Sequence, residues 1–172
     1  MFNIGGYSYI SGPHIHLGSG DVTIGKFCSI GQNIRFITDS HHVDWISAYP
    51  FSHQRMTSDW QPVEGHPIKK DIKIGNDVWI GDSVIIANEC KIGDGAIISA
   101  GSFITRNVKP YSVVGGNPAE RLFFRFSKEN IDLLLKLKWW NLPTEEIKKL
   151  VPILCSNNFN GIRDYLKNKS NE

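Results

Sequence analysis

The sequence has no apolar run that approaches the roughly 20 residues needed to cross a bilayer, so we expect no membrane span. Its first residues lack the cationic start and the continuous apolar stretch of a secretory signal. Cysteine is scarce: Cys28, Cys90 and Cys155 cannot all pair within one chain, and their spacing matches no zinc motif. The expected location is therefore a reducing cytoplasm.

The sequence also lacks a block of basic residues. The net charge is only +2, which disfavours a protein that binds nucleic acid through electrostatic attraction. Hydrophobic residues make up 41% of the chain and charged residues 21%, as in ordinary globular proteins. A length of 172 residues suits one domain with a short appendage.

A six-residue repeat occupies the middle of the chain. From Ile74 the successive blocks read IGNDVW, IGDSVI, IANECK, IGDGAI, ISAGSF and ITRNVK. Each block begins with isoleucine, its second residue is small and its fifth is compact. Two earlier blocks begin at Ile24 and Ile30, and weaker copies begin at Ile4 and Ile10. Such self-similarity at a fixed period is typical of a solenoid.

A period of six fits neither an amphipathic helix nor a simple alternating strand. It fits a coil with three flat sides, each made of one short strand and a turn. We expect each leading isoleucine to point inward and to stack on the isoleucine 18 residues later. Glycine at the second position would let the chain bend at the corner. We therefore predict an all-β solenoid over residues 1–114.

The repeat is interrupted at about residues 36–73, which we predict to be an ordered loop that projects from the solenoid. After residue 114 the repeat ends, and residues 115–172 are predicted to be mainly helical. A first helix is expected after the cap Ser127, and a second from Thr144 to the residue before Pro152. Helices here could cover the open end of the coil.

Several segments resemble a known family. They are IGKFCSIG, HHVDWISAYPF, IGNDVWIGDSVII, IGDGAIISAGSFITRNV, PYSVVGGNPAERLFFRF and KWWNLP. They are similar to the hexapeptide-repeat acyltransferases, and most of all to the xenobiotic acetyltransferase branch. The resemblance implies a left-handed parallel β-helix, a homotrimer with active sites between subunits, and acetyl-CoA as cosubstrate.

The resemblance places the catalytic histidine in a segment of the form H-x-x-D-W-x-S, which makes it His41. Acyl transfer needs a base to remove a proton from the attacking group, and an imidazole with a pKa near 6.5 suits that task. Asp44 could hold one ring nitrogen and so fix the tautomer, but a backbone carbonyl could do the same. The nearest rival for the base is His42. Aromatic residues of the inserted loop are candidates for binding the acceptor: Trp45, Tyr49, Phe51 and Trp60.

The same resemblance implies a coenzyme groove between two coils, with pantetheine at an Ala-Gly-Ser turn and the phosphates near a threonine and an arginine. Glu120 and Phe123 depart from the basic residues that some sugar acetyltransferases have there, so Arg121 and Arg125 are candidate substitutes. The residues assigned to the coenzyme are Trp79, Gly81, Ala100, Gly101, Ser102, Thr105, Arg106, Gly116, Asn117, Pro118 and Arg121.

These features predict an acetyl-CoA-dependent O-acetyltransferase that needs no metal and acts on the hydroxyl of a sugar, a polysaccharide precursor or an antibiotic. Three alternatives remain at this stage. One is N-acetylation of an amino sugar. Another is a zinc enzyme like the γ-class carbonic anhydrases, for which His41, His42 and His66 supply the number of ligands. The last is a non-catalytic solenoid that only binds partners.

Overall fold

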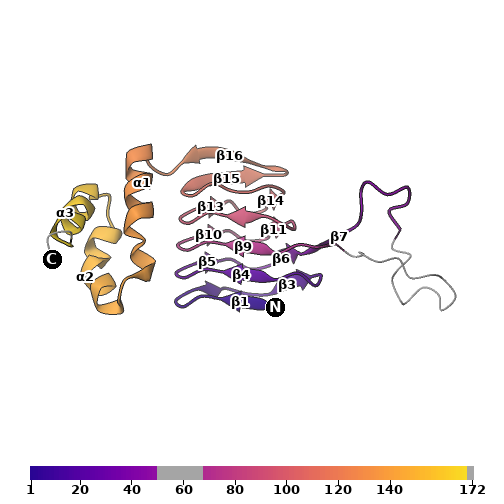
Figure 1. The fold of residues 1–172 in the computed structure, drawn as a ribbon, viewed down its shortest axis with the longest axis horizontal. Coiled ribbons are helices and arrows are strands. Elements are labelled where there is room, and N and C mark those ends of the chain that lie inside the picture. Colours follow the sequence, from indigo (N-terminus) through magenta and orange to yellow (C-terminus); the bar gives the residue numbers. More distant parts are fainter. Residues whose placement is uncertain (50–67, 170–172) are drawn as a thin grey trace.

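The computed structural model describes residues 1–49 and 68–169. The chain forms a parallel β-solenoid of about five turns, followed by a helical segment that stands beside it (Figure 1). The predicted solenoid is thus confirmed. Within the described part of the chain, none of the helices has the length and apolar character required to cross a bilayer.

The solenoid has three sides, and each side is one sheet. The first sheet contains β1 (Phe2–Ile4), β4 (Val22–Ile24), β9 (Ile72–Ile74) and β12 (Lys91–Ile92). The second contains β2 (Tyr9–Ile10), β5 (Ser29–Ile30), β10 (Trp79–Ile80), β13 (Ile97–Ile98), β15 (Ser112–Gly116) and β16 (Ala119–Phe124). The third contains β3 (His14–Leu17), β6 (Ile34–Ile37), β11 (Ile85–Ile86) and β14 (Phe103–Ile104). All neighbours pair in parallel except β15 and β16, which form an antiparallel hairpin.

The core is the column of leading isoleucines that the repeat predicts. Ile74 is in register with Ile92, and Ile80 with Ile98, so isoleucines 18 residues apart stack on one another. Ile24 is in register with Ile74, fifty residues away, because the insertion adds 32 residues to that coil. The fifth position of each block also faces inward, and these residues are all buried: Val78, Val84, Cys90, Ala96, Ser102 and Val108.

The corners differ from the prediction in one respect. The residue that takes a left-handed backbone is the fourth of the first five blocks from Ile74, as at Asp77 with φ 55° and Ser83 with φ 59°. The glycine at the second position serves a different purpose. A Cβ added to Gly75 would lie 2.6 Å from the Oδ1 atom of Asp94 in the next coil. Glycine is needed there because the coils approach closely.

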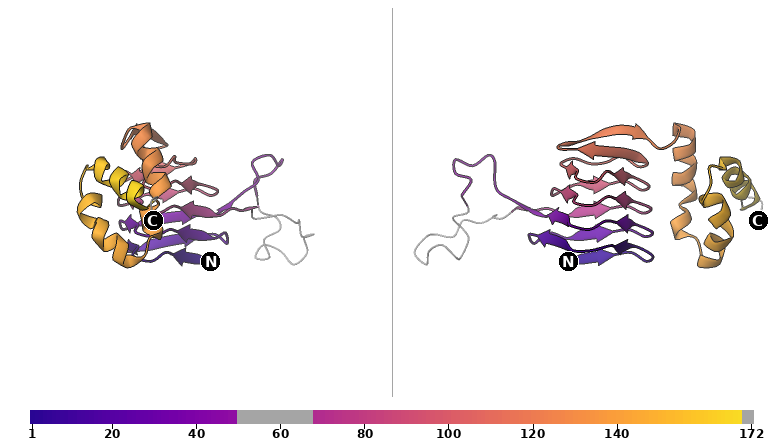
Figure 2. Two further views of the ribbon diagram at one scale, coloured as in Figure 1. Left: turned by 60° about the vertical axis from the view of Figure 1, so that its left-hand side comes forward. Right: turned by 180° about the vertical axis from the view of Figure 1, so that it is seen from behind.

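The insertion leaves the solenoid between β6 and β9. Its base is a short antiparallel pair, β7 (Asp39–Ser40) and β8 (Ile68–Lys69). Residues 41–49 project away from the solenoid on the side opposite the helices, as the views of Figure 1 and Figure 2 both show.

The division predicted between residues 114 and 115 falls inside β15, because the hairpin continues the second sheet as far as Phe124. Four helical elements follow: α1 (Lys128–Leu137), the 3-10 helix η1 (Trp139–Asn141), α2 (Thr144–Leu154) and α3 (Phe159–Lys169). Ser127 caps α1 as predicted, since its Oγ accepts a hydrogen bond from the Asn130 amide. The expected end of the second helix before Pro152 is wrong, because α2 continues for three more residues, to Leu154. Proline at that point removes only one hydrogen-bond donor and keeps a helical φ.

The helices do not cover the open end of the coil. They pack instead against the corner where the first sheet turns into the second (Figure 1). At that corner the ring of Phe27 lies 4.7 Å from the ring of Tyr7 and 4.7 Å from that of Trp139. The hydroxyl of Tyr7 is also hydrogen-bonded to the hydroxyl of Thr144 at 3.3 Å.

Candidate functional site

His41 follows directly after β7, in the projecting segment, and is exposed. Its Nδ1 atom lies 2.7 Å from the carbonyl oxygen of Ala48. A carbonyl only accepts hydrogen bonds, so Nδ1 carries the proton and donates it. In that tautomer Nε2 holds the lone pair and is the atom that can accept a proton.

The predicted partner of this histidine, Asp44, has a different contact. Its Oδ1 lies 3.5 Å from Nδ1 of His42, and the ring of His42 stacks on that of Trp45 with centroids 3.8 Å apart and an interplanar angle of 4°. Of the two means of orientation left open by the sequence, the structure brings the backbone carbonyl to His41. A main-chain acceptor leaves no signal in a sequence, so the sequence alone could not choose between it and the carboxylate of Asp44.

The aromatic residues predicted to bind the acceptor are only partly described. Trp45 is 38% exposed and has one face covered by His42, while Tyr49 is 39% exposed. Phe51 and Trp60 lie outside the described residues, as does His66 of the zinc alternative.

Part of the predicted coenzyme set lines a groove of about 650 Å³ on the outer face of the second sheet. Trp79, Gly81 and Ala100 belong to it, and the indole of Trp79 is 55% exposed. Phe123, which the sequence marks only as a departure from the sugar acetyltransferases, lines the same groove. A flat, exposed aromatic surface next to a backbone turn is suited to hold the long apolar and amide-bearing arm of a coenzyme.

The predicted phosphate contacts lie in a second hollow of about 350 Å³ at the open end of the solenoid, which Thr105, Arg106 and Arg121 line. The Nη2 atom of Arg106 donates to Oε1 of Glu120 at 2.5 Å, and both side chains are 63% exposed. The guanidinium carbon of Arg121 lies 4.6 Å from the ring centroid of Phe124. The structure therefore places six of the eleven predicted coenzyme residues on two surfaces, three on each.

The turn regions show which atoms are available to a ligand. Ser102 is buried, and its Oγ donates to the carbonyl of Ser99 at 2.5 Å, so its hydroxyl faces the solenoid interior. Gly101 is exposed, and no atom lies within 4 Å of where its Cβ would be. At the hairpin turn between β15 and β16, Gly116, Asn117 and Pro118 are all exposed.

Comparison with known proteins agrees with this geometry. The family model described as bacterial transferase hexapeptide (six repeats) matches residues 71–106. The chain is 39% identical to a chloramphenicol acetyltransferase from Morganella morganii over 94% of this chain and 86% of that protein. It is 46% identical to a probable macrolide acetyltransferase from Lysinibacillus sphaericus, over 77% of this chain and 76% of that protein. The chain belongs to the xenobiotic branch of the hexapeptide-repeat acetyltransferases.

A solved structure agrees with this family. The hexapeptide-repeat containing acetyltransferase from Vibrio cholerae superimposes with a TM-score of 0.58 at 30% identity, covering 73% of this chain and 68% of that one. The chain is accordingly an acetyltransferase, and acetyl-CoA is its cosubstrate.

Two thiols lie inside the solenoid of this acetyltransferase. Burial raises the pKa of the Cys90 thiol to about 11, and it raises the pKa of Cys28 as well. A thiol needs to ionise before it can attack an acyl group, so neither is suited to form an acyl-cysteine intermediate. Among residues 1–49 and 68–169, no three histidine, cysteine or acidic side chains come together in a way that could hold a metal.

Proposed function

We propose that this acetyltransferase transfers the acetyl group of acetyl-CoA to a hydroxyl, with His41 as the general base. The observation that carries the proposal is the contact between Nδ1 of His41 and the carbonyl of Ala48, which fixes the tautomer in which Nε2 accepts a proton. Asp44 then has no direct part in orienting the base, because its carboxylate pairs with His42.

In the proposed reaction the acceptor hydroxyl gives its proton to Nε2 while its oxygen attacks the thioester carbonyl of acetyl-CoA. The tetrahedral intermediate then collapses, the carbon–sulfur bond breaks, and the imidazolium returns the proton to the CoA thiolate. The products are an acetyl ester and free CoA thiol. The Ala48 carbonyl keeps the ring in place and stabilises its positive charge. A general base of this kind is typically worth about 10²–10⁴ in rate.

We further propose that the site forms between subunits of a homotrimer. The segment that carries the base projects away from its own solenoid, on the side opposite the helices. The groove with Trp79 and Ala100 is formed by the second sheet and includes no residue of that segment. A neighbouring copy would place its own groove beside the projecting His41.

The acceptor we favour is the hydroxyl of an antibiotic. Several relatives are named after antibiotics: chloramphenicol, macrolides and virginiamycin A, the last from Staphylococcus aureus at 40% identity over 85% of this chain. A neutral imidazole suffices to remove a proton from a hydroxyl as it attacks. A sugar hydroxyl is the second candidate, and the exposed aromatic faces of the loop suit either ring system.

The proposal is tested by measuring CoA thiol release with chloramphenicol, virginiamycin A, a macrolide, an amino sugar and a nucleotide sugar. Mass spectrometry of the product distinguishes an ester from an amide. His41→Ala should lower kcat by at least about 10² without weakening CoA binding. His42→Ala is the matched control and should retain most of the activity. Unchanged turnover in His41→Ala, or acetylation of amines alone, would overturn the proposal.

The shared site has its own test. His41→Ala chains are co-expressed with Ala100→Trp chains, whose coenzyme groove is blocked, and mixed oligomers are purified by two different tags. If sites form between subunits, some interfaces combine an intact histidine with an intact groove, and activity returns. If each site belongs to one chain, the mixture stays as inactive as its parents.

A further inference from the structure

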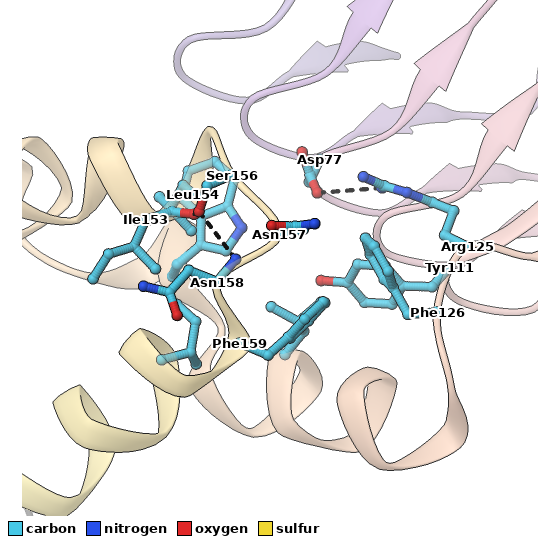
Figure 3. Close-up of a pocket in the computed structure, with 13 residues that line it drawn as sticks. Asp77, Tyr111, Arg125, Phe126, Ile153, Leu154, Ser156, Asn157, Asn158 and Phe159 are labelled. Carbon is cyan, nitrogen blue, oxygen red and sulfur yellow. Dashed lines mark hydrogen bonds and ion pairs between the residues drawn. The ribbon is translucent and has the colours of Figure 1, made fainter.

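A separate cavity lies between the solenoid and the helices, and we call it the corner pocket. Its volume is about 120 Å³. The solenoid side contributes Asp77, Tyr111 and Arg125, and the helical side contributes Trp139, Asn157 and Phe159 (Figure 3). About 10–15 Å³ of such space suffices for one water molecule, so this cavity has room for a ligand of several heavy atoms. Neither the coenzyme nor the acceptor is placed there by the proposed function.

The hydroxyl of Tyr111 has no hydrogen-bond partner among the described residues, although the residue is only 1% exposed. In Figure 3 this hydroxyl points into the corner pocket, toward Asn157 and Phe159. Burial raises the pKa of Tyr111 far above its ordinary value, so the group is a neutral phenol that can both donate and accept. A buried polar group without a partner costs about 1–3 kcal/mol, which a hydroxyl-bearing ligand would recover.

The surrounding structure holds the Tyr111 ring in this position. Tyr111 has a left-handed φ of 54°, which is unfavourable for a bulky side chain. The ring packs against Gly95, where an added Cβ would lie 2.3 Å from Cε1 of Tyr111. The guanidinium of Arg125 lies 5.5 Å from the centroid of the same ring. The left-handed backbone at Tyr111 and the space left by the missing side chain of Gly95 together direct the phenol into the cavity.

The charged groups at the pocket favour a neutral ligand. Nη1 of Arg125 lies 3.7 Å from Oδ2 of Asp77 and donates to the carbonyl of Gly95 at 2.7 Å. The pair presents both donors and acceptors while its charges cancel. An anion would face the carboxylate, and a cation would face the guanidinium, so either would be repelled by one member of the pair.

Aromatic rings form the walls of the corner pocket. Phe126 lies 6.0 Å from Tyr111 and 5.0 Å from Phe159, in each case between ring centroids. Trp139 lines the cavity from the helical side. Apolar ring faces around a few polar groups are the usual composition of a small-molecule site. They suit the carbon face of a ring whose edges carry hydroxyls.

We propose that the corner pocket binds a small neutral polyol, no larger than one sugar ring, with the Tyr111 hydroxyl, the Asp77–Arg125 pair and Asn157 as its hydrogen-bonding partners. The ligand of this site does not contact His41, and the corner pocket adjoins the groove at Trp79, because Arg125 and Phe126 line both.

The test uses the full-length protein and saturation-transfer difference NMR. The neutral probes are glycerol, glucose and galactose, and the charged probes are acetate and tetramethylammonium. Tyr111→Phe removes only the hydroxyl, and should weaken binding of a neutral polyol by about tenfold, the value of one hydrogen bond. Its thermal midpoint should not fall, because the lost group has no partner. Tyr165→Phe is the matched control: its hydroxyl donates to Glu146 outside the corner pocket, so polyol binding should not change.

Binding of a neutral probe that Tyr111→Phe weakens and Tyr165→Phe does not would support the proposal. A second variant, Asn157→Ala, keeps the test informative if Tyr111→Phe unfolds, because Asn157 is an exposed residue at the pocket and its loss should also weaken binding. Three results would overturn the proposal: no neutral probe binds, so that the cavity holds water only; both tyrosine variants bind equally well; or a charged probe binds more tightly than every polyol.

Discussion

Nδ1 of His41 and the carbonyl oxygen of Ala48 lie 2.7 Å apart, across seven residues of one projecting segment. The acceptor is a main-chain atom, so no substitution of a side chain removes it. The carboxylate three residues after the histidine, Asp44, pairs instead with His42. The orientation of the proposed base therefore depends on the backbone conformation of the segment and not on an acidic side chain.

Asp44→Asn tests this arrangement. Where a carboxylate orients a catalytic histidine directly, replacing it by an amide lowers kcat by about 10⁴. Here the amide would disturb only the contact with His42, so we expect kcat to fall by less than about tenfold. The measurement is steady-state kinetics with acetyl-CoA and the best acceptor, beside His41→Ala as the inactive reference. A loss as large as that of His41→Ala would show that Asp44 holds the base after all.

A second prediction concerns the pH dependence of stability. Burial raises the pKa of Asp77 to about 6, more than its contact with Arg125 lowers it. The folded state therefore binds this proton more tightly than the unfolded chain, whose aspartates have a pKa near 3.9. The stability that this group contributes is complete below about pH 4 and is lost as the pH rises through about 6.

Asp77→Asn should remove that loss. Asparagine tolerates the left-handed backbone at this corner, where φ is 55°. Relative to the native chain, the variant should gain about 1–2 kcal/mol of unfolding free energy between pH 4 and pH 8. Urea titrations at several pH values measure this difference. The contributions of the other carboxylates cancel in it because both proteins have them. A difference that shrinks as the pH rises would mean that the pair with Arg125 outweighs the cost of burial.

The ion pair between Arg106 and Glu120 leads to a third prediction. Both side chains are 63% exposed, so the pair is held weakly and the guanidinium can exchange its partner for a phosphate. If Arg106 binds the coenzyme phosphates, Arg106→Gln should weaken CoA binding several-fold, and more so at low salt. Glu120→Gln removes the competing carboxylate and should tighten CoA binding. Calorimetric titration measures the CoA affinity of both variants. Equal changes in affinity would mean that Arg106 does not bind the coenzyme phosphates.

The sequence predicts the core well because each coil repeats one local rule. Every leading isoleucine from Ile74 to Ile104 is buried, and so is every fifth residue, since a period of six is incompatible with any other regular structure. The corners were less predictable. Glycine at the second position is compatible both with a bend and with a close approach, and only the distance from Gly75 to the next coil decides between them.

Contacts between distant segments could not be predicted from the repeat. Phe27 packs between Tyr7 and Trp139, and this contact places the helices at a corner of the solenoid. The hairpin of β15 and β16 lies at the end of the coil instead. None of these three aromatic residues belongs to the predicted helical faces or to the hexapeptide core. The orphan hydroxyl of Tyr111 likewise depends on packing between the two parts of the chain.

The close approach of the coils gives the last prediction. A Cβ on Gly81 would lie 2.6 Å from the backbone nitrogen of Ala100 and 2.9 Å from its Cα, and backbone atoms in a sheet cannot move aside easily. Gly81→Ala should therefore destabilise the protein by about 1–3 kcal/mol, as overpacking does in other cores. Gly6→Ala is the matched control, because nothing lies within 4 Å of its added Cβ.

Alanine restricts the unfolded chain equally at both positions, which by itself would stabilise either variant by about 0.4–1 kcal/mol. Gly6→Ala should thus be neutral or slightly stabilising, and the difference between the two midpoints in urea measures the cost of separating the coils. Because Gly81 and Ala100 both line the coenzyme groove, the displaced backbone should also raise KM for acetyl-CoA in Gly81→Ala alone. Equal stability of the two variants would mean that the coils can part without cost, and that the glycine at the second position is there for the bend.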